Sequence, residues 1–395
     1  MIFPISKGVL RNRIVQTVSV AELLRLMGRS GVWVFIPIYL LDRGSSYLDV
    51  GFLFLFSALA SIPVSIFGGN LIDRAGRRRI ALLLPPSMSL LFLVMFLGMY
   101  LSLSIYVVYL TFVVFSAVAT LQSVADMVII TDTTLETERI DAFSLTRIGA
   151  NVGFSLGPAI SGYVVSFNFS ILPLIPMVLE ILGFLLFYKF VRYEEGHLER
   201  GKSLVSFPRG DGRFLFISVI LSLAFFSMGP WAYILPQFFS RVDLISTTVI
   251  GLLFATNGVV VVTLQLPVNR LFYRFHEMNR VAIGLIIYAV TFFVFGVTRS
   301  IPLLFLDVVF LTIGENVVSP PMNSIIGKIA PENKRGEYYG GYSLMNNFVS
   351  PISPIVYEVL LSYLYSKPLI LWGTTAIICV VLAVSIPATR KIWSY

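Results

Sequence analysis

The feature that most constrains this chain is a series of apolar runs of 20 or more residues, separated by short polar connections. A helix of that length crosses the roughly 30 Å hydrocarbon core of a bilayer. Only 13% of the residues are charged, whereas soluble domains need about a quarter to keep a hydrated surface. We therefore predict an all-α integral membrane protein whose main solvent is lipid.

The apolar runs, bounded by charges, Gly and Pro, predict twelve membrane-spanning helices. Their predicted ranges are 14–41, 48–72, 80–100, 104–130, 142–166, 170–190, 214–239, 246–271, 280–298, 302–327, 337–363 and 368–389. The longest polar stretch separates the first six helices from the last six. We predict an N-terminal bundle over 1–190, a cytoplasmic linker over 191–213 and a C-terminal bundle over 214–395.

The formal net charge of +8 could suit binding to nucleic acid, but the positions of the basic residues indicate a membrane topology instead. Most of the 29 Lys and Arg fall in connections on one side of the predicted membrane, and cytoplasmic connections carry such an excess. The connections on the opposite side hold only Arg43, Arg241, Arg299 and Lys367. We expect a multi-pass cell-membrane protein with both termini in the cytoplasm and no nucleic-acid partner.

Residues that commonly bind metals or cofactors are scarce. The chain has one cysteine, Cys379, and two histidines, His197 and His276, so no disulfide framework or metal-ligand spacing is present. No nucleotide-binding loop or nucleophile–base motif is found either. We expect no enzymatic activity, no cofactor and no bound metal, so an ion gradient or the substrate's own gradient would supply the energy for transport.

The two halves resemble each other at an offset of about 200 residues. Trp33 corresponds to Trp231, residues 51–54 correspond to 251–254, and Arg74 corresponds to Arg274. Duplicated bundles are typical of secondary transporters, whose substrate site lies near the membrane midplane between the repeats. The repeat therefore predicts two pseudo-symmetric six-helix bundles.

A charged motif joins the second and third predicted helices: Gly69-Asn70-Leu71-Ile72-Asp73-Arg74-Ala75-Gly76-Arg77-Arg78. It resembles the signature loop of the major facilitator superfamily, which reads G-x-L-x-D-R-x-G-R-R at this place. The resemblance implies the fold of that superfamily and alternating access. It also implies a cytoplasmic gate, to which we assign Gly69, Asp73, Arg74, Gly76 and Arg77, together with Asp132 of the fourth helix.

The physical properties of the loop residues fit this role. Gly69 would let another helix approach closely, and Gly76 permits a turn that residues with a Cβ resist. Asp73 can cap a helix or pair with arginine, and Asp132 resembles the acid that pairs with an arginine of the loop. The alternative is that the loop is only a positively charged anchor, a function to which Asp73 would add nothing.

The fifth predicted helix carries Gly149, Gly153 and Gly157 at intervals of four, followed by Pro158. This spacing forms a flat face suited to close helix packing. The stretch resembles the G-x-x-x-G-P-x-x-G-G motif of the drug–proton antiporter branch, with Ser161 at the first of its final glycines. The resemblance indicates the branch of the superfamily and which helices move during transport. It gives no information on the substrate.

Ionisable residues inside apolar runs are the candidates for coupling and binding, because such groups must pair, be protonated or face a wet cavity. Glu315 in the tenth helix resembles a proton-sensing position of proton-coupled exporters, although a structural carboxyl is an equal alternative. Glu22, Arg25 and Arg29 share one face of the first helix. We expect Glu22 to serve proton coupling and to pair with Arg25, which leaves Arg29 to meet a substrate anion or Glu315.

Further candidates are weaker. We expect a substrate cavity lined by Arg25, Arg29, Trp33, Asn151, Trp231 and Asn346. Glu180 is expected to be structural, and Asp307 and Glu358 are expected to reach headgroup water. Prolines in the seventh and eleventh helices predict bendable segments: Pro230, Pro236, Pro351 and Pro354.

These features favour a monomeric secondary transporter that exports a small hydrophobic or drug-like compound in exchange for protons. The alternative is uptake or exchange of an anionic metabolite, with Arg25 and Arg29 as ligands of its carboxylate or phosphate. A membrane receptor or scaffold that keeps the fold without transporting is disfavoured, because it would have no need for costly charges inside the membrane.

Overall fold

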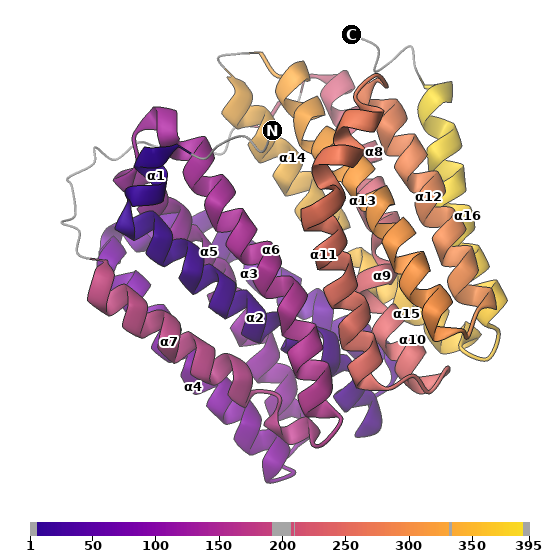
Figure 1. The fold of residues 1–395 in the computed structure, drawn as a ribbon, viewed down its shortest axis with the longest axis horizontal. Coiled ribbons are helices and arrows are strands. Elements are labelled where there is room, and N and C mark those ends of the chain that lie inside the picture. Colours follow the sequence, from indigo (N-terminus) through magenta and orange to yellow (C-terminus); the bar gives the residue numbers. More distant parts are fainter. Residues whose placement is uncertain (1–5, 192–206, 209, 332–333, 390–395) are drawn as a thin grey trace. The chain divides into compact units, whose positions relative to one another are not determined.

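The computed structural model describes residues 6–191, 207–208, 210–331 and 334–389, which form helices and no strands (Figure 1). The helices of the N-terminal half are α1 (Lys7–Arg11), α2 (Arg13–Asp42), α3 (Tyr47–Ala75), α4 (Arg77–Tyr100), α5 (Ile105–Thr133), α6 (Arg139–Val165) and α7 (Leu174–Phe190), with short 3-10 helices η1 (Glu136–Glu138) and η2 (Phe169–Ile171). Those of the C-terminal half are α8 (Gly212–Met228), α9 (Pro230–Tyr233), α10 (Leu235–Arg241), α11 (Thr247–Phe272), α12 (Glu277–Val297), α13 (Ile301–Ile329), α14 (Arg335–Val349), α15 (Ile352–Leu364) and α16 (Pro368–Ala388).

Every predicted span coincides with helix in the structure. Among the described residues, 11 helical segments are long and apolar enough to cross a membrane. One of them, Gly212–Arg241, comprises α8, α9 and α10, and the remaining predicted span is divided at Ser350 and Pro351 into α14 and α15. The predicted linker over 191–213 lies mostly outside the described residues.

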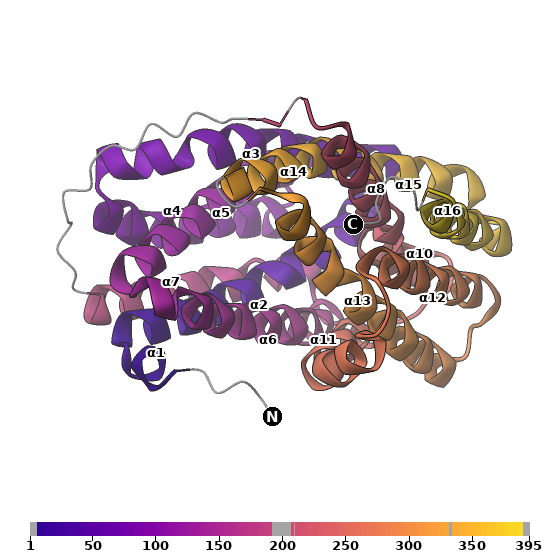
Figure 2. The same ribbon diagram turned by 90° about the horizontal axis from the view of Figure 1, so that it is seen from above.

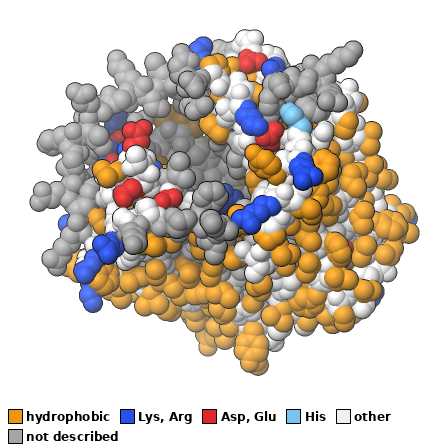
Figure 3. All heavy atoms as spheres, turned by 45° about the horizontal axis from the view of Figure 1, so that its top comes forward, with side chains coloured by type: hydrophobic (Ala, Val, Ile, Leu, Met, Phe, Trp, Pro, Cys, Tyr) orange, Lys and Arg blue, Asp and Glu red, His pale blue; other side chains and the backbone are white. Residues whose placement is uncertain are grey.

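Surface composition follows the expected pattern of a membrane protein. Figure 3 shows charged side chains gathered toward the end of the helices that Figure 1 draws at the top, whereas hydrophobic side chains cover the flank below. Within each unit, consecutive long helices run in alternate directions. An apolar flank beside a charged end is what a bilayer requires.

Contacts divide the chain into two compact units. Unit 1 comprises Met1–Ser45, Phe52–Leu198 and Ile245–Gly258, and unit 2 comprises Ser46–Gly51, Glu199–Leu244 and Val259–Tyr395. The first residues of α3 therefore group with unit 2, and the first half of α11 groups with unit 1. The predicted domain boundaries at 190 and 214 stay a prediction.

In unit 1, α2 lies between α6 and α7 (Figures 1 and 2), and its approach to α6 depends on the predicted glycine face. A Cβ at Gly149, Gly153 or Gly157 would stand only 2.2–2.5 Å from backbone carbonyl oxygens of α2. These glycines therefore let two backbones touch, as small residues do between membrane helices. The predicted packing role is confirmed, and α6 runs through Pro158 without ending.

In unit 2, α12 lies between α13 and α16 (Figure 2). Buried apolar side chains of α8, α12 and α13, such as Leu221, Leu285 and Val318, form its core. Gly284 of α12 faces the backbone of Gly314, which brings α12 and α13 close together. This contact sets the position of the neighbouring Glu315.

Candidate functional site

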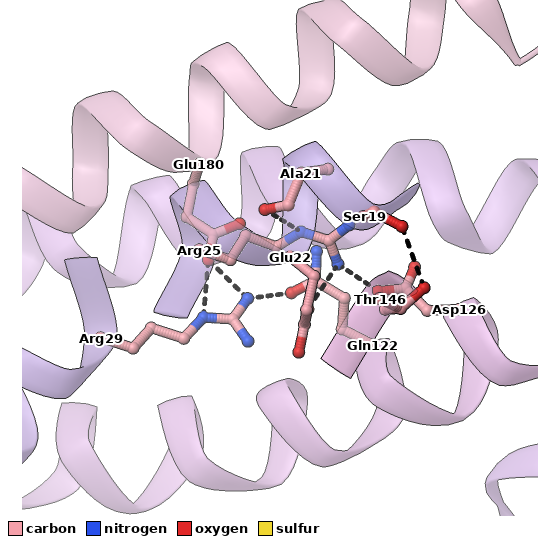
Figure 4. A network of polar contacts seen from close by, with 9 residues as sticks. All are labelled: Ser19, Ala21, Glu22, Arg25, Arg29, Gln122, Asp126, Thr146 and Glu180. Atoms are coloured by element: carbon pink, nitrogen blue, oxygen red, sulfur yellow. Dashed lines mark hydrogen bonds and ion pairs between the residues drawn. The ribbon is translucent and has the colours of Figure 1, made fainter. Parts of the chain in front are cut away.

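The polar network of unit 1 is built around the first membrane-spanning helix (Figure 4). Glu22, Arg25 and Arg29 lie at spacings of three and four on α2, so they share one helical face. That face looks toward α5 and α7, which contribute acids and an amide from distant parts of the sequence. The predicted inward orientation of these charges is confirmed.

Arg25 is held by a carboxylate of α5. Its side chain is 1% exposed, and its Nη1 atom lies 2.6 Å from Oδ2 of Asp126. Its Nε atom donates to the carbonyl of Ala21 at 3.2 Å, and the guanidinium stacks over the ring of Phe187. Glu22 is more distant, at 3.8 Å, so Asp126 is the main counter-charge of Arg25.

Arg29 is held by a carboxylate of α7. Its Nε atom donates to Oε1 of Glu180 at 2.7 Å, and its Nη2 atom donates to Oε1 of Gln122. Glu180 is completely buried. The expectation that Arg29 stays free for a substrate anion or for Glu315 is therefore wrong, because an acid in the sixth predicted span neutralises it. The structural role expected of Glu180 consists of this pairing.

The network contains three carboxyl groups and two guanidinium groups. Asp126 and Glu180 each form an ion pair with an arginine, whereas Glu22 is partly exposed and lies at the edge of the network. Buried ions without partners are expensive in a membrane, which explains why each arginine has its own acid. Glu22 is therefore the most exposed of the three carboxyl groups.

Hydroxyl groups extend the network to α6. Ser19 Oγ and Thr146 Oγ1 share a hydrogen bond of 3.1 Å (Figure 4), one turn before the close approach of α6 to α2 begins. Asn151, a predicted cavity residue on α6, is half-buried. Trp33 is also half-buried, and its ring packs 5.6 Å from that of Phe54.

The other predicted cavity and coupling residues belong to unit 2. Glu315 on α13 is half-buried, Trp231 on α9 is buried, and Asn346 on α14 is half-buried with its Oδ1 atom lacking a hydrogen-bond partner among the described residues. Their roles stay predictions.

The signature loop forms a compact ion cluster. Arg77 donates from Nε and Nη2 to Oδ1 of Asp73 at 2.9 and 2.8 Å, and from Nη1 to Oδ2 of Asp132. The predicted pairing of Asp132 with the loop is therefore present. Gly76 has φ +93°, the left-handed conformation that glycine tolerates best, and it turns the chain from α3 into α4.

Two expectations for this loop have different outcomes. A Cβ at Gly69 would meet nothing within 4 Å among the described residues, so the expectation of a close helix contact there is wrong in this structure. Arg74 is exposed at the end of α3. The role of the cluster as a gate stays a prediction.

Sequence reasoning missed how deeply two acids of unit 2 are buried. Glu358 on α15 is 0% exposed and Asp307 on α13 is 5% exposed, so the expectation that they reach headgroup water is wrong. Both lie near the predicted ends of spans, but their neighbours enclose them. The sequence does offer one signal of this burial: neither acid has a basic residue one helical turn away in its own span.

Comparison with known proteins identifies the family. The profile of the Major Facilitator Superfamily matches residues 18–354 and, in a second match, 233–392. The chain belongs to the Major Facilitator Superfamily. It is thus a secondary transporter and not an enzyme, and its helices have the predicted fold.

Individual relatives are distant. The chain is 23% identical over 347 residues to the uncharacterized MFS-type transporter YqjV of Bacillus subtilis, covering 85% of this chain and 84% of that protein. It is 23% identical over 384 residues to a Na(+), Li(+), K(+)/H(+) antiporter of Planococcus maritimus, covering 88% and 89%. The crystal structure of the nucleoside transporter NupG superposes with a TM-score of 0.80 at 12% identity, covering 95% and 99%. At that identity the structural likeness concerns the fold alone.

Proposed function

We propose that this chain is a proton-coupled antiporter that exports a small hydrophobic or drug-like compound, cationic or neutral, from the cell by alternating access. Both termini would lie in the cytoplasm, where the Lys- and Arg-rich connections belong. Glu315 and Glu22 would bind and release the protons that are transported in exchange for the substrate. The Arg77 cluster would close the cytoplasmic side. We expect the transporter to work as a monomer.

The pairing of both first-helix arginines with buried acids carries this proposal. An anionic substrate would need to displace Asp126 or Glu180 from Arg25 or Arg29, and each displacement leaves a carboxylate buried without its partner. Breaking a buried ion pair in this way costs several kcal/mol. The network instead offers the carboxyl of Glu22 to a cation or a proton.

Two other observations support the same proposal. The glycine face over residues 149–157, which resembles that of drug–proton antiporters, packs against α2 with carbonyl oxygens within 2.5 Å of each would-be Cβ. The relative from Planococcus maritimus is named as an antiporter that exchanges monovalent cations for protons.

Transport by proteoliposomes tests the proposal. The purified protein would be reconstituted with a pH-sensitive dye inside, and a proton gradient would be imposed. Tetraphenylphosphonium, a neutral lipophile, benzoate and sodium ions would then be added in turn to separate vesicle samples. We expect proton flux with the lipophilic cation or the neutral compound, loss of flux in Glu315→Gln, and partial flux in Glu315→Asp.

The contrary result is equally defined. Flux with benzoate alone, retained in Glu315→Gln and lost in Arg29→Gln, would refute the proposal and favour transport of an anionic metabolite. Proton flux with sodium ions alone would indicate that the substrate is a monovalent cation and not a hydrophobic compound.

A further inference from the structure

We propose that Glu358 and Gln237 form a further proton-binding site, located in unit 2 at the end of that unit opposite its Lys- and Arg-rich connections. The proposal rests on the proposed proton coupling and adds a site to it. These two residues belong neither to the signature loop nor to the network of α2, and they are distinct from Glu315.

The site is a closed contact between two short helices. Glu358 on α15 and Gln237 on α10 are both 0% exposed, and Figure 1 draws these helices toward the lower end of unit 2. The Nε2 atom of Gln237 donates to Oε1 of Glu358 and also to the carbonyl of Tyr233 at 2.9 Å. Oε2 of Glu358 and Oε1 of Gln237 have no hydrogen-bond partner among the described residues.

Within the described part of the chain, no ion pair involves Glu358. The basic residue on the surrounding helices is Arg241, which ends α10 one turn after Gln237 and is exposed. The other titratable groups near Glu358 are phenols and a thiol, none of which carries positive charge: Tyr47, Tyr233, Tyr357 and Cys379. The contrast is with Asp126 and Glu180, which each have a guanidinium.

The uncharged form of Glu358 is therefore the form that this conformation holds. An ionised carboxylate that is buried without a cation is strongly unfavourable, whereas a carboxylic acid needs only hydrogen bonds. Its carbonyl oxygen accepts from Gln237, and its hydroxyl group carries the bound proton. Proton release requires that water or a cation reach the carboxyl.

Both partners lie on segments that can move. α15 follows the break at Ser350 and Pro351, and α10 follows the breaks at Gly229 and Ile234. Proline removes a backbone donor and loosens a helix, so these short segments are hinged to the longer helices before them. Opening of the contact would hydrate Glu358 and release its proton, and rebinding of the proton would restore the closed contact.

Infrared difference spectroscopy of the protein in nanodiscs tests the site directly. Spectra would be recorded between acidic and alkaline buffers for the wild type, Glu358→Gln, Glu315→Gln and Ser362→Ala. Ser362 is a matched control on α15, since the partner of its hydroxyl among the described residues is the carbonyl of Val359 in its own helix. We expect a band of a protonated buried carboxyl that is lost in Glu358→Gln, kept in Glu315→Gln and Ser362→Ala, and shifted in Gln237→Leu.

Proton flux in proteoliposomes supplies the second readout. Glu358→Gln mimics the protonated acid and should fold, and we expect it to reduce substrate-driven proton flux at least tenfold while substrate binding persists. A carboxyl band that survives in Glu358→Gln, or proton flux at the wild-type rate in that variant, would overturn the inference. A wild type with the band but without flux for any substrate would uphold the site and refute the proposed antiport instead.

Discussion

Neutralising Glu180 should destabilise unit 1, because the substitution Glu180→Gln leaves Arg29 buried without its counter-charge. Two unit charges about 4 Å apart attract each other by about 4 kcal/mol at an effective dielectric constant of about 20. Removal of one partner from a buried pair costs about 3–5 kcal/mol. Arg29 keeps its hydrogen bond to Gln122, and glutamine can still accept a hydrogen bond at position 180. We therefore expect a loss of about 2–4 kcal/mol.

A double-mutant cycle isolates the pair. Arg29→Gln should cost a similar amount, whereas the double variant should cost about 2 kcal/mol less than the sum, because it leaves no charge unpaired. Glu22→Gln on the same helix is the control. Its carboxyl is 19% exposed and lies 3.8 Å from Arg25, so we expect less than about 1 kcal/mol.

Free energies of unfolding would be measured by titration with denaturing detergent in mixed micelles, with tryptophan fluorescence and helical circular dichroism as probes. A coupling energy below about 0.5 kcal/mol, within the additivity expected of independent sites, would show that Glu180 does not neutralise Arg29. That result would remove the main argument against an anionic substrate.

Three further predictions concern other parts of the chain. Gly153→Ala should cost about 1–3 kcal/mol in the same unfolding assay, because its methyl group would stand 2.2 Å from a carbonyl oxygen of α2. Gly373→Ala is the control: no described residue lies within 4 Å of its added methyl group, so it should be neutral or stabilising by up to about 1 kcal/mol. Arg77→Gln should lower the transport rate in proteoliposomes at least tenfold without unfolding the protein. Arg77→Lys should restore little of that rate, because lysine lacks the bidentate geometry of arginine. Full transport activity of either variant would contradict the role of the cluster as a gate. Burial raises the pKa of Asp243 to about 6, although Arg299 lies 2.8 Å away. The folded state therefore binds this proton more tightly than the unfolded state, and stability should fall as pH rises from about 4 to about 6. The thermal stability of Asp243→Asn should lack this dependence on pH, and an unchanged dependence would exclude Asp243 as its cause.

Local patterns of the sequence predicted what depends on one helix or one turn. Apolar runs located the spans, and the spacing of Gly149, Gly153 and Gly157 predicted a packing face that the structure shows against α2. The signature loop predicted the pairing of Arg77 with Asp132, because the resemblance includes both residues. Each of these conclusions needs only local geometry or a motif of the family.

The partners of the buried charges could not be predicted in the same way. Arg29 and Glu180 are 151 residues apart, and Arg25 and Asp126 are 101 residues apart. Spacing shows which residues share a helical face, but it does not show which helix that face meets. Glu22 is the acid nearest to Arg25 in sequence, so the sequence predicts that pair, although Asp126 lies closer to Arg25 in the structure.

Pairing of the arginines also changes which groups can respond to a proton. Asp126 and Glu180 each lie against a guanidinium, so removing the charge of either acid would leave a buried cation without its counter-charge. Glu22 is partly exposed and Glu358 has no cation, so a change of protonation at these carboxyls leaves no guanidinium without its acid. Under the proposed function, Asp126 and Glu180 would stabilise the bundle, whereas Glu22 and Glu358 would be acids that cycle between two states. Alternating access needs the second kind, because a coupling group must bind its proton in one conformation and lose it in the other.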